Sequence, residues 1–237
     1  MNEPRKEIYM KIWKVLVLVM ILLLAFAVNR SFEFEKNEKI DGTECNKTTK
    51  SEKILTLEGR RIVLDPGHGG NDIGASGQNG TIEKQVTLET ANKIKAALEQ
   101  AGAEVQLTRD DDKYVELEER VELAAENQAD LFVSIHYDAF ETNDVGGMTS
   151  YYYHKRDQKL AECIHQHIFM EDIYARNRGV SYGDYYVLRE NKIPAVLLEL
   201  GYISNAEDEA RINSAAFQGK IATGIVGGIK DFFGRIG

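Results

Sequence analysis

The chain has 237 residues, of which 43% are hydrophobic and 28% are charged, and its formal net charge is −9. This composition is typical of a globular protein, and the acidity excludes a nucleic-acid-binding protein, which needs a basic face. With only Cys45 and Cys163, the chain has neither a disulfide framework nor a four-cysteine metal site, although one long-range bridge between them stays open.

The N-terminal segment 1–28 has the pattern of a signal peptide or a membrane anchor. Basic residues precede an unbroken apolar run, Val15 to Val28, which rises about 21 Å as a helix, less than the ~30 Å hydrocarbon core of a bilayer. This length favours a signal peptide, with Ala25-Phe26-Ala27 as the cleavage pattern. The alternative is an uncleaved anchor that reaches back to Met10. In both cases the basic flank predicts an extracytoplasmic protein, secreted or anchored to the outer face of the cytoplasmic membrane.

Residues 29–58 are polar and charged, with few large apolar groups to bury, and they indicate a linker. We expect one folded domain over residues 59–237, which is long enough to enclose a hydrophobic core.

The domain alternates between strand and helix patterns. Short apolar runs predict strands at 62–64, 105–108, 131–135, 148–153, 185–188 and 195–198. Apolar residues at helical spacing predict helices from 83 to 101, near 117–125, at 158–170 and at 217–232. This alternation predicts an α/β fold with a mostly parallel, mixed central sheet flanked by helices.

Four polar residues follow the predicted strands. His68 comes four residues after the first strand, His136 and Glu199 come directly after the strands at 131–135 and 195–198, and Glu83 opens the first helix. In open α/β sheets, ligand sites form beyond the carboxyl ends of the strands, so we expect these side chains to lie close together.

Two imidazoles and one carboxylate are a typical ligand set for catalytic zinc, and a second carboxylate could move protons. Each residue also has a simpler interpretation when it is taken alone. A single histidine at a strand end is more often an ordinary core or surface group. Glu83 could be a first-turn carboxylate favoured by the helix dipole, and Glu199 could pair with an arginine. Residue pattern alone leaves both interpretations open.

Other motifs are weaker. Gly179-Val180-Ser181-Tyr182-Gly183 matches a serine-hydrolase elbow, but no histidine follows His167. Gly67-x-Gly69 resembles the start of a dinucleotide-binding loop, but Asp72 stands where that motif needs glycine. We expect His154, His165 and His167 to be surface groups.

Four blocks of sequence resemble the zinc-dependent N-acetylmuramoyl-L-alanine amidases of the type 3 family. They are Leu64-Asp65-Pro66-Gly67-His68-Gly69-Gly70, Gly80-Thr81-Ile82-Glu83-Lys84, Ser134-Ile135-His136 and the run from Pro194 to Asn205. Thr108-Arg109 and Leu117 to Arg120 also fit the family pattern. The blocks occur in the family's order and span nearly the whole predicted domain.

The resemblance implies a role for each residue. His68, Glu83 and His136 correspond to ligands of a Zn²⁺ cofactor, and Glu199 corresponds to the catalytic glutamate. The implied reaction is hydrolysis of the amide between N-acetylmuramic acid and L-alanine in peptidoglycan. One departure is visible, because Asp138 stands where the family usually has asparagine.

The layout, an export segment followed by one catalytic domain without a wall-binding module, resembles family members that mature spore-cortex peptidoglycan by muramic-δ-lactam formation. The alternative is a non-catalytic peptidoglycan-binding protein on the same fold, although the four intact site residues argue against it. Little sequence remains between His136 and Glu199 for a helix that plugs the site. We therefore expect an accessible site that is controlled from outside, either by the timing of synthesis or by an exported activating protein partner.

Overall fold

The computed structural model of the protein describes residues 56–236. The predicted export segment and nearly all of the predicted linker lie outside the described residues. From residue 56 to residue 236, no helix is long and apolar enough to cross a membrane.

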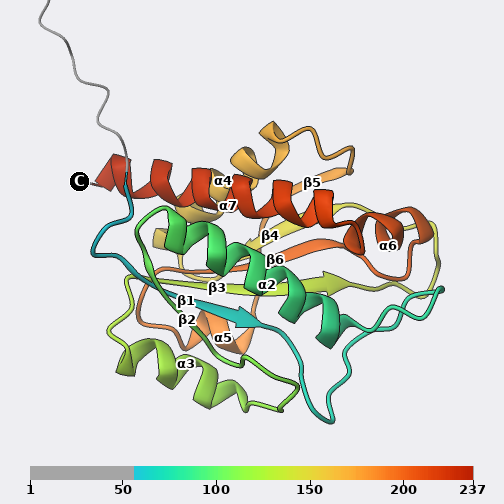
Figure 1. Ribbon diagram of the computed structural model, residues 1–237, viewed down its shortest axis with the longest axis horizontal. Helices are drawn as coiled ribbons and strands as arrows, with labels where there is room; N and C mark the ends of the chain where they lie inside the picture. The colour runs from blue at the N-terminus through green and yellow to red at the C-terminus, as the bar shows by residue number, and fades with distance from the viewer. Residues whose placement is uncertain (1–55, 237) are drawn as a thin grey trace, which may run out of the picture. The chain divides into compact units, whose positions relative to one another are not determined.

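The described residues form a six-stranded mixed sheet with helices on both faces (Figure 1). The strands are β1 (Arg61–Pro66), β2 (Glu104–Leu107), β3 (Leu131–Asp138), β4 (Met148–Tyr152), β5 (Asn177–Tyr182) and β6 (Ala195–Tyr202). The helices are α2 (Glu83–Gln100), α3 (Leu117–Glu126), η1 (Lys155–Asp157), α4 (Gln158–Met170), α5 (Tyr186–Arg189), α6 (Ala206–Ile212) and α7 (Ala215–Ile236).

The sheet order is β2-β1-β3-β6-β4-β5. In this order, β2, β1, β3 and β6 are mutually parallel. Strand β4 runs antiparallel to β6, and β5 runs parallel to β4. The structure therefore confirms the predicted α/β fold with a mostly parallel, mixed sheet.

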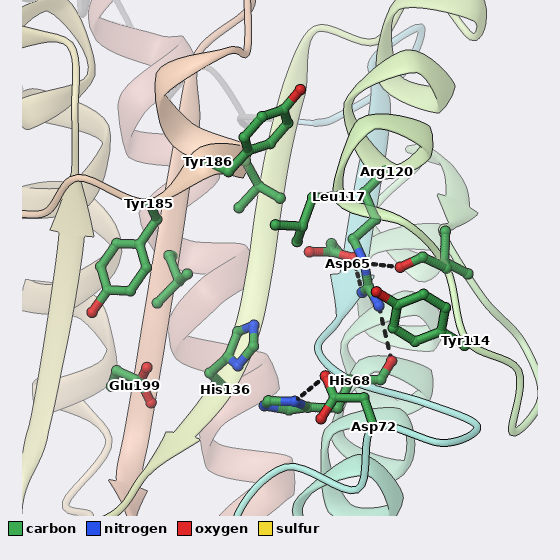
Figure 2. A pocket seen from close by; sticks show the side chains of 13 residues that line it. Asp65, His68, Asp72, Tyr114, Leu117, Arg120, His136, Tyr185, Tyr186 and Glu199 are labelled. Carbon is green, nitrogen blue, oxygen red and sulfur yellow. Dashed lines mark hydrogen bonds and ion pairs between the residues drawn. The ribbon is translucent and has the colours of Figure 1, made fainter.

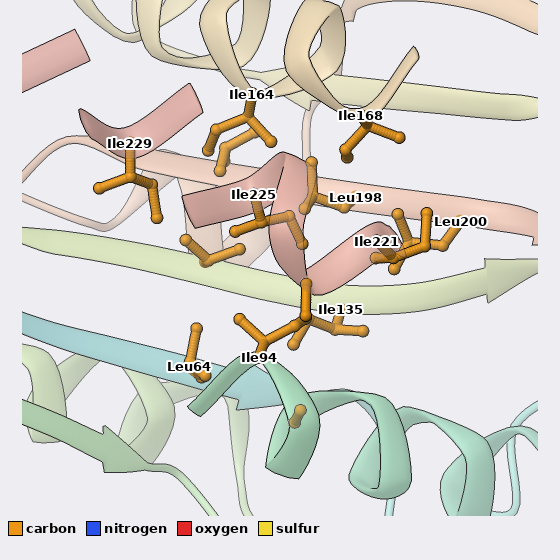
Figure 3. Packing of buried hydrophobic residues seen from close by; sticks show 14 of the residues in the cluster. Leu64, Ile94, Ile135, Ile164, Ile168, Leu198, Leu200, Ile221, Ile225 and Ile229 are labelled. Atoms are coloured by element: carbon orange, nitrogen blue, oxygen red, sulfur yellow. The ribbon is translucent and has the colours of Figure 1, made fainter. Parts of the chain in front are cut away.

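Alternate residues of the central strands β1, β3 and β6 enter two different hydrophobic cores, as the two-residue period of a strand requires. Leu64, Ile135 and Leu198 pack with α2, α4 and α7 (Figure 3). Their neighbours Val63 and Leu197 belong to a smaller cluster with α3 and α5 on the opposite face. The central strands are buried on both sides, which explains their almost continuous apolar sequences.

Helix α7 packs closely against α4 because two glycines, one helical turn apart, face the partner backbone. A Cβ atom on Gly224 would lie 2.5 Å from the Cα of Ile168, and one on Gly228 would lie 2.4 Å from the Cα of Ile164. The absence of side chains at these positions lets the two helices meet over the sheet.

The predicted strand at 185–188 was wrong. Tyr186–Arg189 forms the short helix α5, whose Val187 and Leu188 enter the smaller core. The edge position of the sheet is taken instead by β5, which carries few apolar residues and is largely accessible. A short apolar run does not distinguish a strand from a helical turn, and a polar edge strand gives no periodic signal.

The prediction that His165 is a surface group was also wrong. Its side chain is buried, and its ring nitrogens lie 2.9 Å from the Ser150 hydroxyl and 2.9 Å from Asn177 Oδ1. His165 thus links α4 to β4 and β5 as part of the core. Ser181 lies within edge strand β5, which is not the strand-to-helix turn that a nucleophile elbow requires.

Candidate metal centre

Three elements bring His68, Glu83 and His136 together. His68 lies in the loop after β1, Glu83 is the first residue of α2, and His136 lies on β3, next to β1 in the sheet. One ligand atom from each residue falls within 4.8 Å of the other two. Glu83 Oε1 is 3.0 Å from His68 Nε2 and 3.2 Å from His136 Nδ1.

These separations fit a metal ion. Ligand atoms bound 2.0–2.1 Å from a tetrahedral zinc lie about 3.3 Å apart. The other ring nitrogen of His68 lies 2.8 Å from Asp72 Oδ2, which is the carboxylate–histidine arrangement that orients metal-binding imidazoles (Figure 2). Glu83 Oε1 also accepts from the Tyr137 amide at 3.0 Å, and Oε2 accepts from the Ala75 amide at 2.8 Å. The carboxylate is thereby held in place from both sides.

The surroundings favour an ionised Glu83. Burial raises the pKa of this carboxyl, but the hydrogen bonds and charges of His136 and His68 outweigh burial and hold it well below its usual range. An ionised carboxylate between two imidazoles is the protonation state that a metal ligand needs.

Glu199 lies on β6 beside this cluster. It is the register partner of His136, it is 8% exposed, and its Oε2 atom has no hydrogen-bond partner within the described part of the chain. Burial raises its pKa well above the usual value, and the carboxylates of Asp138 and Glu83 raise it further. Glu199 is thus a buried carboxyl with a free oxygen that is poised to take up a proton.

His68, His136 and Glu199, but not Glu83, line a cavity of about 270 Å³ on the α3–α5 face of the sheet. Tyr185 and Tyr186 form one wall, and Tyr114 and Leu117 form the other (Figure 2). His68, His136 and Glu199 lie at the same end of this cavity. A substrate group could therefore occupy an apolar, aromatic pocket next to the candidate metal ligands.

The profile of the N-acetylmuramoyl-L-alanine amidase family matches residues 62–231 of this chain. The chain belongs to this family.

Individual relatives agree with the match. The "probable cell wall amidase LytH" of Staphylococcus aureus is 44% identical over 179 residues, which cover 75% of this chain and 60% of the relative. The chain therefore matches only about 60% of the length of this relative. Among solved structures, the amidase AmiC2 of Nostoc punctiforme is 40% identical with a TM-score of 0.71, covering 74% of this chain and 98% of that one. The CwlD amidase of Clostridioides difficile, solved in complex with the GerS lipoprotein, is 34% identical with a TM-score of 0.70, covering 74% of this chain and 99% of that one.

The structure gathers all four sequence-predicted site residues of this amidase-family chain, while their chemical roles stay predictions. The positions of His136 and Glu199 within their strands differ from the sequence prediction. His136 and Glu199 do not end their strands, because β3 continues to Asp138 and β6 to Tyr202. The pairing of these two long strands sets the two side chains next to each other.

Sequence reasoning missed Asp72, Tyr185 and Tyr186, and it gave Asp138 no role. Asp72 was noted only as the residue that excludes a dinucleotide-binding loop, although its spacing of four from His68 in a glycine-rich loop could have suggested a contact. Asp138 raises the pKa of Glu199 by like charge, which depends on the pairing of β3 with β6.

Proposed function

We propose that this chain is an N-acetylmuramoyl-L-alanine amidase that hydrolyses the amide between the lactyl group of N-acetylmuramic acid and L-alanine in peptidoglycan. In this proposal, His68, Glu83 and His136 hold a zinc ion and Glu199 carries the proton. The observation that supports it most directly is the free Oε2 atom of Glu199 beside three converging metal donors. Family membership supplies the substrate class.

A zinc ion held by His68, Glu83 and His136 would supply Lewis acidity, which would polarise a carbonyl oxygen and lower the pKa of water. The raised pKa of Glu199 matches its proposed work as a general base and then a general acid. Its carboxylate accepts a proton from water as the new C–O bond forms. The same proton then goes to the leaving amine as the C–N bond breaks.

The test compares Glu199→Gln with His136→Ala. We expect Glu199→Gln to keep the fold and one zinc per chain but to release stem peptides from purified peptidoglycan ~10²–10⁴ times more slowly. His136→Ala should lose most of the zinc, measured by elemental analysis. His154→Ala is the control, because His154 contacts the Arg189 carbonyl, away from the metal cluster.

Near wild-type release of stem peptides by Glu199→Gln would show that Glu199 does not carry the proton. If even the zinc-loaded wild type binds peptidoglycan without cleaving it, the non-catalytic binding protein becomes the better proposal. Full zinc retention by His136→Ala would remove this residue from the metal ligands.

The finer proposals concern place and partner. We propose that the enzyme acts outside the cytoplasmic membrane, either secreted or anchored, and that an exported protein activates it. The complex of the CwlD amidase with a lipoprotein supports such a partner. A role in spore-cortex maturation by muramic-δ-lactam formation is supported by the likeness to CwlD, whereas the likeness to LytH favours a general wall role. Muramic-δ-lactam content in peptidoglycan from cells with and without the enzyme separates these roles.

A further inference from the structure

Two buried arginines from different elements hold the loop that carries His68. Arg109 follows β2 and is 1% exposed, and Arg120 lies on α3 and is 3% exposed. Arg109 donates to the Pro66 carbonyl at 3.0 Å and to the Gly67 carbonyl at 2.8 Å. Arg120 donates to the Pro66 carbonyl at 3.1 Å and to the His68 carbonyl at 2.9 Å. Three successive carbonyl groups are therefore held by two guanidinium groups.

Buried arginines rarely serve only to bind backbone carbonyls, because burying a cation without a paired anion has a large desolvation free energy. Arg120 has a carboxylate partner in Asp65, at 2.7 Å. Within residues 56–236, Arg109 has no ion pair, and its remaining bonds go to the carbonyls of Asp111 and Lys84 and to the Thr87 hydroxyl. A guanidinium presents five N–H donors in a rigid planar fork, whereas the three donors of a lysine ammonium all lie on one rotatable nitrogen.

The held loop has a conformation that needs support. His68 has a φ of 61°, in the left-handed region that residues other than glycine rarely adopt. Such a residue persists only where its surroundings hold it. The loop is also confined from outside, since a Cβ atom on Gly69 would lie 2.1 Å from the Lys113 carbonyl and 2.9 Å from the Arg109 side chain.

We propose that Arg109 and Arg120 are positioning residues that set the metal affinity of the site. They fix the Pro66, Gly67 and His68 carbonyls, which keeps His68 in its left-handed conformation with Nε2 directed at Glu83. This proposal rests on the proposed metal site. It adds that the affinity depends on two cations whose hydrogen bonds, within the described residues, go to the loop backbone and to neighbouring groups rather than to the ligand side chains.

The physical reason is preorganisation. A loop that is already held in its metal-bound conformation loses little conformational entropy on binding, whereas a loop that must first be ordered binds more weakly. Groups that orient metal ligands typically change metal affinity 10–100-fold when they are lost. Lys84 holds the next part of the same loop, because its Nζ donates to the Gly70 carbonyl at 2.9 Å and to Asp112 at 2.7 Å.

The experiment measures the zinc and cobalt affinities of folded apoprotein by chelator competition, together with the absorption spectrum of the cobalt form. Arg109→Lys and Arg120→Lys keep the charge but remove the fork. We expect each to weaken zinc binding about 10–100-fold and to alter the cobalt spectrum. Lys84→Met should weaken binding by a smaller factor.

Lys95→Met is the matched control. Lys95 lies on the same helix as Lys84 and, like it, donates to one backbone carbonyl and one carboxylate. Its acceptors are the Val105 carbonyl at 2.9 Å and Glu99 at 2.7 Å, which are not part of the His68 loop. It should retain wild-type affinity and spectrum. If the arginine variants do not fold, the comparison of Lys84→Met with Lys95→Met decides the question.

Folded arginine variants with wild-type metal affinity and cobalt spectrum would overturn the proposal. Equal affinities for Lys84→Met and Lys95→Met would do so where the arginine variants are unfolded. A wild-type protein that binds neither metal would instead refute the proposed metal site, which is a separate result.

Discussion

Glu83 and Glu199 are two buried glutamates beside one pocket, and their neighbours move their pKa values in opposite directions. Two imidazoles lower the pKa of Glu83 against the effect of burial, whereas burial and two carboxylates raise the pKa of Glu199. Pairs of carboxyl groups with divergent pKa values are typical of sites that need one ionised group and one proton carrier. Residue type alone does not separate the two roles, but local contacts do.

The contacts of Asp65 also change its pKa, and here the consequence is for the stability of the fold. Burial raises its pKa, but the Arg120 charge and the bonds from Thr108, Ser134 and Arg120 hold it below the usual value. A lowered pKa in the folded state stabilises the fold above the unfolded pKa of about 3.9, and this stabilisation is lost as pH falls through the folded value. The contribution is therefore complete at neutral pH and disappears in acid.

We expect Asp65→Asn to lower the free energy of unfolding of the apoprotein at pH 7 by about 3–5 kcal/mol, because it leaves the buried Arg120 without its partner charge. The difference from wild type should shrink below about pH 4. Urea unfolding across this pH range measures both effects. Asp130→Asn removes a half-exposed pair with Arg60 and should cost only about 0–1 kcal/mol. If the difference in unfolding free energy between Asp65→Asn and wild type did not change with pH, the stabilising role given to the ionised Asp65 would be contradicted.

At the scale of elements, the packing of α7 on α4 is decided by which glycines face the partner helix. Gly224 and Gly228 meet the α4 backbone directly, whereas Gly219 in the same helix has no atom within 4 Å of where its Cβ would lie. The three glycines have the same intrinsic cost in a helix, so their different surroundings should give alanine substitutions opposite effects.

Gly228→Ala should lower the free energy of unfolding by roughly 1–3 kcal/mol, because the new methyl group overlaps the Ile164 backbone and forces the helices apart. Gly219→Ala should raise it by roughly 0.5–1 kcal/mol through helix propensity alone. Thermal or urea unfolding of the two variants provides the measurement. Equal changes in both would show that α7 does not pack on α4 through this face.

At the scale of the whole molecule, the sheet order is what assembles the site. Strands β1, β3 and β6 are adjacent and parallel. The loop after β1 therefore lies beside His136 and Glu199 at the carboxyl end of the sheet, although these residues are far apart in sequence. The proposed substrate, peptidoglycan, would require this end of the sheet to lie outside the cytoplasm. The basic flank and apolar run of the first 28 residues support that location.

Protease added to intact protoplasts should digest the domain if it stays anchored, and the culture medium should contain it if the segment is cleaved. A cytoplasmic protein that stays intact in the same sample is the control for lysis. A domain that is protected until the protoplasts are lysed would contradict export.

The sequence by itself determined the fold class and the four candidate site residues. Buried parallel strands are continuous apolar runs, and their ends place polar residues at one edge, so local patterns carry this information. Only the tertiary structure decided that 186–189 is a helix, that His165 is buried, that the charge of Asp138 raises the pKa of Glu199 and that Arg109 and Arg120 bind the carbonyls beside His68. Each of these depends on contacts between segments that are distant in the chain. Their geometry follows from strand register and helix packing, which no short stretch of sequence encodes.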